Sequence, residues 1–315
     1  MISIIGSGKL GSAVALQVAT RELGDLRLVD IVKGLPQGEA LDIAQISAEQ
    51  GSDIDIAGSN DYVEIAGSDI VVVSSGFGRK PGMTRLDLQV KNGEIIRGVC
   101  KKIVEYAPKA LVLMVTNPVD VMTYLAWKVT GFESSRVFGQ SGMLDTTRFK
   151  YFLAKALGIS TSSIQAIVVG EHGDSMLPLP RFSTVSGISI TQLLTPAQIQ
   201  EAVDHTRSVA AEVIALKGST IYAPAHGIAR MIESVTKDKK MVLCMTVHLN
   251  GEYGIKDVYV DVPAVLGARG VERIIELDLN NGEKAAFLKS VEIVKTAVSH
   301  LKTEVPESIL KLVER

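Results

Sequence analysis

The chain has 315 residues, of which 46% are hydrophobic and 22% charged, so it is long enough for one large globular domain or two smaller ones. Its 33 basic and 35 acidic residues are interspersed, which excludes the basic surface that binds nucleic acid or an anionic membrane. Its apolar runs are far shorter than the ~20 residues of a membrane-spanning helix, so we expect a protein that acts on small molecules.

The two cysteines, Cys100 and Cys244, are far apart and form no CxxC pattern. This usage is typical of reduced thiols and gives no indication of a metal site. The first apolar run begins at Ile2, which leaves no room for a charged leader or a cleavable signal segment. We therefore expect a cytoplasmic protein without a bound metal.

Short β-branched runs in the first half of the chain alternate with helical stretches. The runs are residues 2–5, 26–30, 70–74 and 111–116, each bounded by glycine, asparagine or proline. Residues 84–107 carry an apolar stripe at helical spacing, and their opposite face is charged. The alternation predicts an α/β fold with a doubly wound parallel sheet.

The pattern changes after about residue 143. Helical periodicity follows at 144–157, 199–216 and 287–301, and strand-like runs occur at 164–169, 241–249 and 258–262. This mixture predicts a C-terminal α+β domain. We place the N-terminal domain at residues 1–143 and the C-terminal catalytic domain at residues 144–315, closely packed with a cleft between them.

A GxGxxG motif follows the first strand and precedes a helical pattern at residues 13–19. Gly6 permits the tight turn, Gly8 lets the backbone approach a pyrophosphate, and Gly11 lets helix and strand pack closely. Lys9 and Leu10 lie where the helix N-terminus offers free N–H groups. A glycine turn that merely joins strand to helix is the alternative, but the context favours a dinucleotide-binding Rossmann domain.

Asp30 ends the second strand pattern, 19 residues after Gly11. A carboxylate there accepts hydrogen bonds from the adenosine ribose hydroxyls and repels a 2′-phosphate. The sequence therefore predicts NAD rather than NADP as the cofactor, although Lys33 leaves some use of NADP open.

Oxidation of an alcohol by a nicotinamide cofactor needs a base for the hydroxyl proton, and histidine titrates nearest to neutral pH. His205 and His300 lie in helical patterns and His248 in a strand pattern, where structural roles are commoner. His226 lies near a predicted helix start, where a capping or surface role is more common. His172 is the preferred base, because it lies in a polar loop, GEHGD, directly after a strand pattern.

Asp145 and Arg148 are three positions apart in a helical pattern and so share a face. A carboxylate can hold the histidine ring and stabilise the imidazolium, and an arginine can bind a substrate carboxylate through two parallel hydrogen bonds. The alternative is a surface ion pair with no catalytic role, which is common on helices.

The loop of residues 76–85 is punctuated by glycine and proline and carries Arg79 and Arg85. We expect it to act as a mobile lid whose arginines meet anionic substrate groups, the alternative being a solvated basic loop. Asn117 follows the strand at 111–116, so its amide is expected at the cleft edge of the sheet, unless it only starts a turn.

Together these residues resemble the lactate/malate dehydrogenase family, and within it the malate dehydrogenases of the lactate-dehydrogenase-like type. The resemblance covers nearly the whole chain. It rests on GSGKLG at 6–11, LVD ending at residue 30, GEALDI at 38–43, GRKPGMTR at 78–85, TNPVD at 116–120, LDTTR at 144–148 and GEHGD at 170–174.

The resemblance implies a role for each matching residue. His172 would be the proton donor and acceptor, Asp145 its partner, and Arg148 the binder of the C1 carboxylate. Asn117 would contact cofactor and substrate, and Arg85 would polarise the reacting carbonyl. The resemblance also implies a homodimer or homotetramer.

The resemblance further implies reversible oxidation of (S)-malate to oxaloacetate, because Arg79 stands at the position that pairs with a second substrate carboxylate. Thr220 lies where lactate enzymes also often carry threonine. A lactate or other 2-hydroxy-acid dehydrogenase therefore stays open as an alternative. A non-catalytic module that senses NAD is the remoter one.

Overall fold

The computed structural model describes residues 1–78 and 85–301. In the first half, strands and helices alternate as the sequence predicts, and the strands β1, β2, β4 and β5 lie in the four predicted runs. The elements are β1 (Ile2–Ile5), α1 (Lys9–Thr20), β2 (Leu26–Val29), α2 (Leu35–Gln50), β3 (Ile56–Ser59), β4 (Ile70–Val73), α3 (Arg85–Tyr106), β5 (Leu111–Met114), α4 (Val119–Thr130) and β6 (Val137–Gly139).

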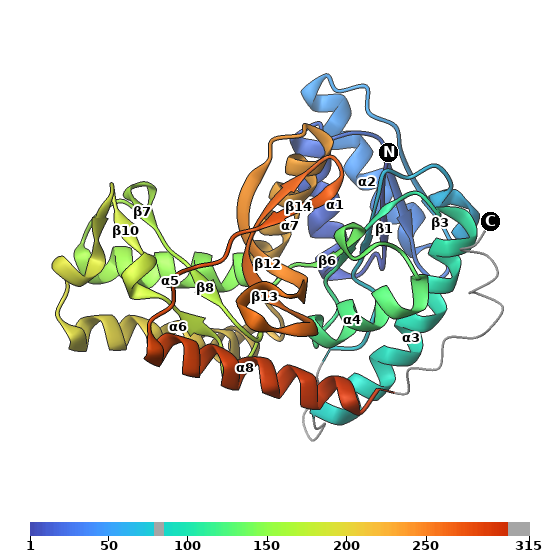
Figure 1. The fold of residues 1–315 in the computed structure, drawn as a ribbon. Helices are drawn as coiled ribbons and strands as arrows, with labels where there is room; N and C mark the ends of the chain where they lie inside the picture. Colours follow the sequence, from blue (N-terminus) through green and yellow to red (C-terminus); the bar gives the residue numbers. More distant parts are fainter. Residues whose placement is uncertain (79–84, 302–315) are drawn as a thin grey trace.

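The second half mixes short strands, a long hairpin and long helices. It contains α5 (Gly142–Leu157), β7 (Ile164–Gln165), β8 (Val168–Val169), β9 (Leu177–Pro178), β10 (Thr184–Val185), β11 (Ile188–Ser189), α6 (Pro196–Lys217), α7 (Tyr222–Thr236), β12 (Met241–Asn250), β13 (Lys256–Gly267), β14 (Gly270–Ile274) and α8 (Asn281–Ser299). Helices α5 and α6 and the small sheets form a lobe at the left of Figure 1.

One sheet of nine strands runs through both halves, in the order β14-β13-β12-β6-β5-β4-β1-β2-β3. Strands β1 to β6 are parallel, which confirms the predicted doubly wound sheet. Strand β12 joins this sheet antiparallel to β6, where Thr246 pairs with Gly139. The division at residues 143 and 144 falls in the first turn of α5 and stays a prediction.

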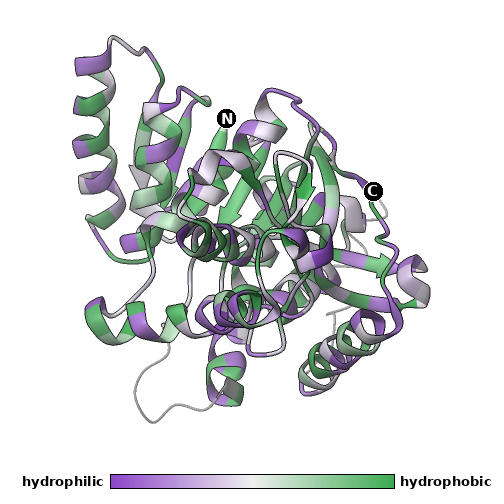
Figure 2. Cartoon of the chain, turned by 90° about the vertical axis from the view of Figure 1, so that its left-hand side faces the viewer, coloured by the Kyte–Doolittle hydropathy of each residue, from purple (hydrophilic) through white to green (hydrophobic). Residues whose placement is uncertain are grey.

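Both faces of the parallel sheet are covered by helices. In β1, Ile2 and Ile4 pack with α1, α2 and α7 on one face, while Ile5 packs with α3 and α4 on the other. Each of these isoleucines is at most 1% exposed, which explains why the strand reads as an unbroken apolar run. Figure 2 shows green strands at the centre of the molecule and purple outer faces on many of the surrounding helices.

The predicted strand at 164–169 is divided in the structure. Strand β7 pairs with β10, whereas β8 pairs with β9 in a different sheet. The backbone of Ile167, between them, instead accepts a hydrogen bond from Leu179 and donates one to the hydroxyl of Ser183. The apolar residues of this segment are largely buried, as predicted, but the chain changes direction between Gln165 and Val168 and forms two short strands instead of one.

Helix α8 runs from the lobe to α3 (Figure 1). There the side chain of Gln89, on α3, donates a hydrogen bond to the carbonyl of Ala297. The start of α8 is fixed by a capping box between Asn280 and Glu283. Within residues 1–78 and 85–301, no helix is long and apolar enough to cross a membrane.

Candidate active site

The glycine motif forms a tight turn between β1 and α1. Gly6 has φ +105°, and a Cβ there would lie 2.6 Å from the backbone nitrogen of Ser75. A Cβ on Gly11 would lie 1.8 Å from the carbonyl oxygen of Gly6, so strand and helix approach too closely for a side chain. A Cβ on Gly8 would meet nothing within 4 Å, so the backbone there is open to a ligand.

The turn is tied to the acid at the end of β2. The backbone N–H of Ser7 donates to Oδ2 of Asp30 at 2.7 Å, and that of Val32 donates to Oδ1 at 2.9 Å. The buried hydroxyl oxygens of Ser7 and Ser75 have no hydrogen-bond partner among the described residues. These unused polar atoms, the space beside Gly8 and the N-terminus of α1 fit a dinucleotide.

A second group of residues lies around the GEHGD loop. Nδ1 of His172 and Oδ2 of Asp145 are 2.7 Å apart, and Nη1 of Arg148 donates to the other oxygen of Asp145 at 2.9 Å. Asp145 is 1% exposed, whereas the histidine and arginine side chains are 17% and 12% exposed. The pair on α5 is therefore buried beside the histidine, which rules out a simple surface ion pair.

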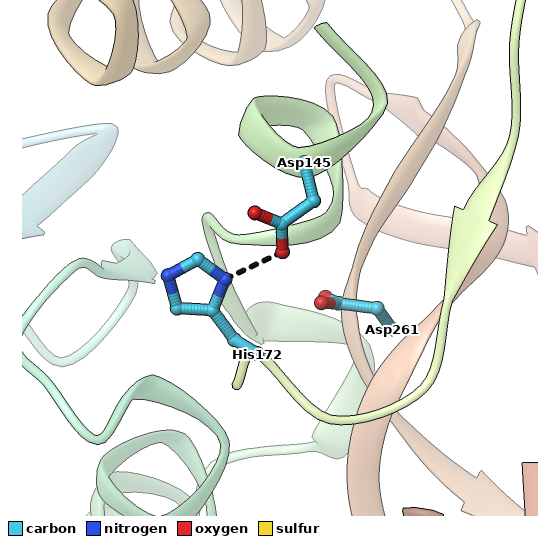
Figure 3. A group of neighbouring side chains, drawn as sticks. All are labelled: Asp145, His172 and Asp261. Carbon is cyan, nitrogen blue, oxygen red and sulfur yellow. Dashed lines mark hydrogen bonds and ion pairs between the residues drawn. The ribbon is translucent and has the colours of Figure 1, made fainter. Parts of the chain in front are cut away.

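The backbone of the GEHGD loop is held from two sides. Gly170 and Asp261 exchange backbone hydrogen bonds of 2.9 and 3.1 Å, and the backbone N–H of His172 donates to Oδ2 of Asp120 at 2.9 Å. With Nδ1 on Asp145, the other ring nitrogen points away from Asp145 and Asp261 (Figure 3). That nitrogen, Nε2, is therefore the one that can exchange a proton with a substrate.

Buried carboxyl groups change the pKa of the histidine. Burial of the His172 ring lowers its pKa, but the negative charge and hydrogen bond of Asp145 raise it more, with Asp261 and Asp120 adding to the rise. The result is a pKa of about 9. The protonated imidazole is thus the stable form at neutral pH in the free protein.

Asp120 and Asp261 also neighbour His172, although no sequence pattern indicated either of them as its neighbour. Asp120 is part of the TNPVD motif, and Asp261 is a charged residue inside an apolar strand, which was the available signal. Both are buried, at 3% and 2% exposed. Their position could not be read from the sequence because α4 and β13 meet only in the folded sheet.

Contacts at the carboxyl ends of the strands tie Asn117 to α3 and to the segment after β4. The side chain of Asn92 accepts from the N–H of Phe77 at 2.8 Å and donates to the carbonyl of Asn117 at 2.7 Å. Asn117 lies exposed at the end of β5, three residues before Asp120. The predicted positions of Asn117 and of the glycine turn thus lie along one edge of the sheet.

Two predicted substrate residues cannot be placed in this way. Arg79 lies outside the described residues. Arg85 is the first residue of α3, and only its place in the backbone is described.

The remaining histidines have other surroundings. His226, in α7, contacts Arg21 at 2.7 Å. His248, in β12, packs on the ring of Trp127 in α4. His205 lies exposed in α6, and His300 ends α8.

The sequence matches two family models, one after the other along the chain. The model described as lactate/malate dehydrogenase, NAD binding domain, matches residues 1–139, and the one described as lactate/malate dehydrogenase, alpha/beta C-terminal domain, matches residues 142–305. A malate dehydrogenase of a Roseiflexus species is 48% identical over 303 residues, which are 96% of this chain and 98% of the relative.

Solved structures show the same likeness. The malate dehydrogenase of Aeropyrum pernix is 44% identical with a TM-score of 0.93, covering 98% of this chain and 99% of that one. A lactate dehydrogenase of Cryptosporidium parvum, complexed with lactic acid and NAD, is 37% identical with a TM-score of 0.91, covering 95% and 96%. Both activities therefore occur among proteins that share this fold.

Proposed function

This chain belongs to the lactate/malate dehydrogenase family, and from that premise we propose that it catalyses the reversible oxidation of (S)-malate to oxaloacetate with NAD. The observation that carries the chemistry is the buried hydrogen bond between His172 and Asp145, whose second oxygen holds Arg148. One ion-paired carboxylate thereby fixes both a proton-transfer group and a carboxylate-binding group.

The glycine turn and Asp30 hold the cofactor. Backbone N–H groups of the turn and of Lys9 and Leu10, in the first turn of α1, would hold the pyrophosphate, and the carboxylate of Asp30 would accept hydrogen bonds from the ribose hydroxyls. When bound, NAD supplies the hydride acceptor for malate and NADH the donor for oxaloacetate. Asn117, at the end of β5, contacts both cofactor and substrate.

His172 moves the proton. In malate oxidation the neutral ring accepts the hydroxyl proton at Nε2, while Asp145 keeps Nδ1 protonated and stabilises the resulting imidazolium. In oxaloacetate reduction the imidazolium returns that proton to the carbonyl oxygen.

The arginines bind the charged and polar ends of the substrate. Arg148 uses one donor on Asp145 and keeps others for the C1 carboxylate. Arg85 polarises the reacting carbonyl, and Arg79 pairs with the second carboxylate. That second charge separates malate from lactate, because an unpaired carboxylate in a closed cleft costs on the order of 3–5 kcal/mol.

Steady-state rates with NADH and either oxaloacetate or pyruvate test the proposal. We expect the higher kcat/KM with oxaloacetate. A higher value with pyruvate would make the chain a lactate dehydrogenase, and NADH binding without turnover of any 2-oxo acid would make it a sensor module.

The two directions should depend oppositely on pH. With a His172 pKa of about 9, kcat/KM for oxaloacetate is expected to stay level below pH 9 and fall above it, because reduction needs the protonated ring. For malate it is expected to rise with pH up to about 9, because oxidation needs the neutral ring. Initial rates in both directions from pH 6 to 10 check this, and parallel profiles would contradict it.

The choice of NAD should depend on Asp30. Asp30→Ser is expected to lower kcat/KM with NADH and raise it with NADPH, changing their ratio by about tenfold or more, because the repulsion of a 2′-phosphate is removed. Asp53→Ser, an exchange in the loop before β3, is the matched control. An unchanged ratio in Asp30→Ser would mean that another residue selects the cofactor.

We also propose that the protein is a cytoplasmic homodimer or homotetramer whose NAD-binding and catalytic domains divide between residues 143 and 144. Large apolar side chains are exposed on α2 and near α7, including Leu41, Leu216 and Tyr222. A second subunit that covered them would remove this apolar surface from water. Analytical ultracentrifugation distinguishes monomer, dimer and tetramer.

A further inference from the structure

A second carboxyl group lies beside the His172–Asp145 pair. Asp261, on β13, is 2% exposed, and one polar atom each of Asp145, His172 and Asp261 lie within 4.8 Å of one another (Figure 3). Both oxygens of Asp145 are already used by His172 and Arg148. Asp261 is therefore an additional negative group that faces the histidine without replacing its partner.

Asp261 also positions the histidine loop through its backbone. It exchanges hydrogen bonds with Gly170, two residues before His172. A Cβ on Gly142 would lie 3.0 Å from the Asp261 side chain, so the start of α5 also packs directly on it. The carboxyl group is thus fixed relative to both the loop and the helix that carry the site.

The hydroxyl group of Thr246 links Asp261 to Asp120. Oδ1 of Asp261 accepts from Ser141 at 2.5 Å and from Thr246 at 2.9 Å. The Thr246 hydroxyl also lies 3.3 Å from Oδ1 of Asp120, whose other oxygen accepts from the His172 backbone. The network therefore acts on His172 in two ways: through the hydrogen bond to the His172 backbone and through the electrostatic attraction between the carboxyl groups and the ring.

Among the side chains that the structure describes, negative groups outnumber positive ones around this network if every carboxyl is ionised. Within that part of the chain, His172 and Arg148 are the cations that act on Asp120, Asp145 and Asp261, and Glu171 adds a further negative charge toward Asp120. Burial raises the pKa of the remaining titratable group, Cys244, to about 11, so it stays neutral.

Burial raises the pKa of both Asp120 and Asp261. The charge of Asp261 adds to the rise at Asp120, and the charge of Asp145 adds to the rise at Asp261, whose pKa becomes about 6. Two buried carboxyl groups that repel one another titrate as a pair, so the first proton that binds belongs to both groups together.

We propose that Asp261 is a positioning residue for His172: it shares one proton with Asp120 through Thr246, and its ionised form stabilises the protonated imidazole. The proton-transfer role of His172 on which this rests belongs to the proposed function. In oxidation the ring gains a proton beside this charge, which favours the imidazolium, and in reduction it gives the proton up against the same attraction. Asp261 therefore raises the pH at which the protonated ring, needed for reduction, and the neutral ring, needed for oxidation, are equally populated.

The test is Asp261→Asn, which keeps the size of the side chain and removes its charge. NMR titration of ¹⁵N-histidine-labelled protein without cofactor, with the His172 signal assigned by its loss in His172→Gln, is expected to show a His172 pKa about one unit lower. In initial-rate assays, kcat/KM for malate at pH 7, where Asp261 is ionised in the wild type, is expected to rise by about tenfold, and that for oxaloacetate at pH 9 to fall by about fivefold. A merely structural role would lower both.

Asp257→Asn is the matched control, because Asp257 lies on the same strand with its side chain 58% exposed. It is expected to leave the His172 pKa unchanged. A His172 pKa within about 0.2 units of the wild type in folded Asp261→Asn would overturn the proposal. The titration needs no turnover, so it tests the role of Asp261 even if the protein does not act on oxaloacetate. Absence of turnover with oxaloacetate would contradict the proposed function and leave the result of the titration unaffected.

Thr246→Val and Thr246→Ser supply a second comparison that does not depend on the folding of Asp261→Asn. The valine removes the hydroxyl that stabilises ionised Asp261, so the His172 pKa is expected to fall. The serine keeps the hydroxyl and is expected to restore the wild-type pKa. Equal His172 pKa values in the two variants would show that the hydroxyl link has no influence.

Discussion

Replacing His172 by glutamine is expected to lower kcat in both directions by about 10²–10⁴-fold, the usual contribution of a positioned acid–base group. Glutamine retains hydrogen-bonding capacity toward Asp145 but cannot carry a proton between the substrate oxygen and solvent. The cofactor cradle lies on the turn after β1, held by Asp30 and the backbone near Ser75 rather than by the histidine. The Kd for NADH, measured by fluorescence titration, is therefore expected to change by less than about twofold.

The same exchange at His205 is the matched control, because this exposed histidine lies in α6 outside the His172 network. His205→Gln is expected to retain wild-type kcat. Turnover by His172→Gln at more than a tenth of the wild-type rate would remove this residue from the proton transfer and reopen the search among the other histidines.

Replacing Arg79 by glutamine is expected to change which substrate is preferred. The variant should lose about 10²–10³-fold in kcat/KM for oxaloacetate, because the second carboxylate of the substrate would then enter the site without a cation. Pyruvate has a methyl group in place of that carboxylate, so its kcat/KM is expected to stay level or rise. Steady-state assays with both 2-oxo acids give the ratio directly.

Lys80→Gln is the control for Arg79→Gln, since it removes a positive charge from the adjacent position. A general electrostatic attraction of the dianionic substrate would make both variants lose activity to a similar degree. An unchanged oxaloacetate-to-pyruvate ratio in Arg79→Gln would show that the second carboxylate is bound elsewhere.

The parts of the fold that the sequence predicts are those fixed by local chemistry. The turn at Gly6 and Gly11 could be predicted because both positions exclude any side chain, one against Ser75 and the other against Gly6 itself. Four buried strands of the parallel sheet could be predicted because burial on both faces gives unbroken apolar runs. Strand β6 (Val137–Gly139) was missed although it is buried, because three residues are too few to form a recognisable run. Strand β3 was missed, because its residues Ile56–Ser59 are only half-buried and include a glycine.

The site was predictable only where its residues lie close together in sequence or within a motif. Asp145 and Arg148 share a helical turn, and the GEHGD loop presents its histidine among glycines. Asp261 and Thr246 contribute through contacts between β12, β13, α4 and the GEHGD loop, more than 70 positions from His172 along the chain. Such contacts depend on the register of a sheet, which no local pattern specifies.

Thr246 has two places in this molecule, because its backbone pairs with Gly139 where β12 joins the parallel sheet, while its hydroxyl connects Asp120 and Asp261 beneath the histidine. A Cβ on Gly139 would lie 2.9 Å from the Cβ of Thr246, so the seam between the two halves of the sheet admits no larger residue. During folding, the acid–base group therefore acquires its full set of neighbours only when that seam closes. Recovery of catalytic activity after denaturation thus reports on completion of the whole sheet. The second half of the chain alone carries His172 but lacks Asp120, one of the groups that set the pKa of this histidine.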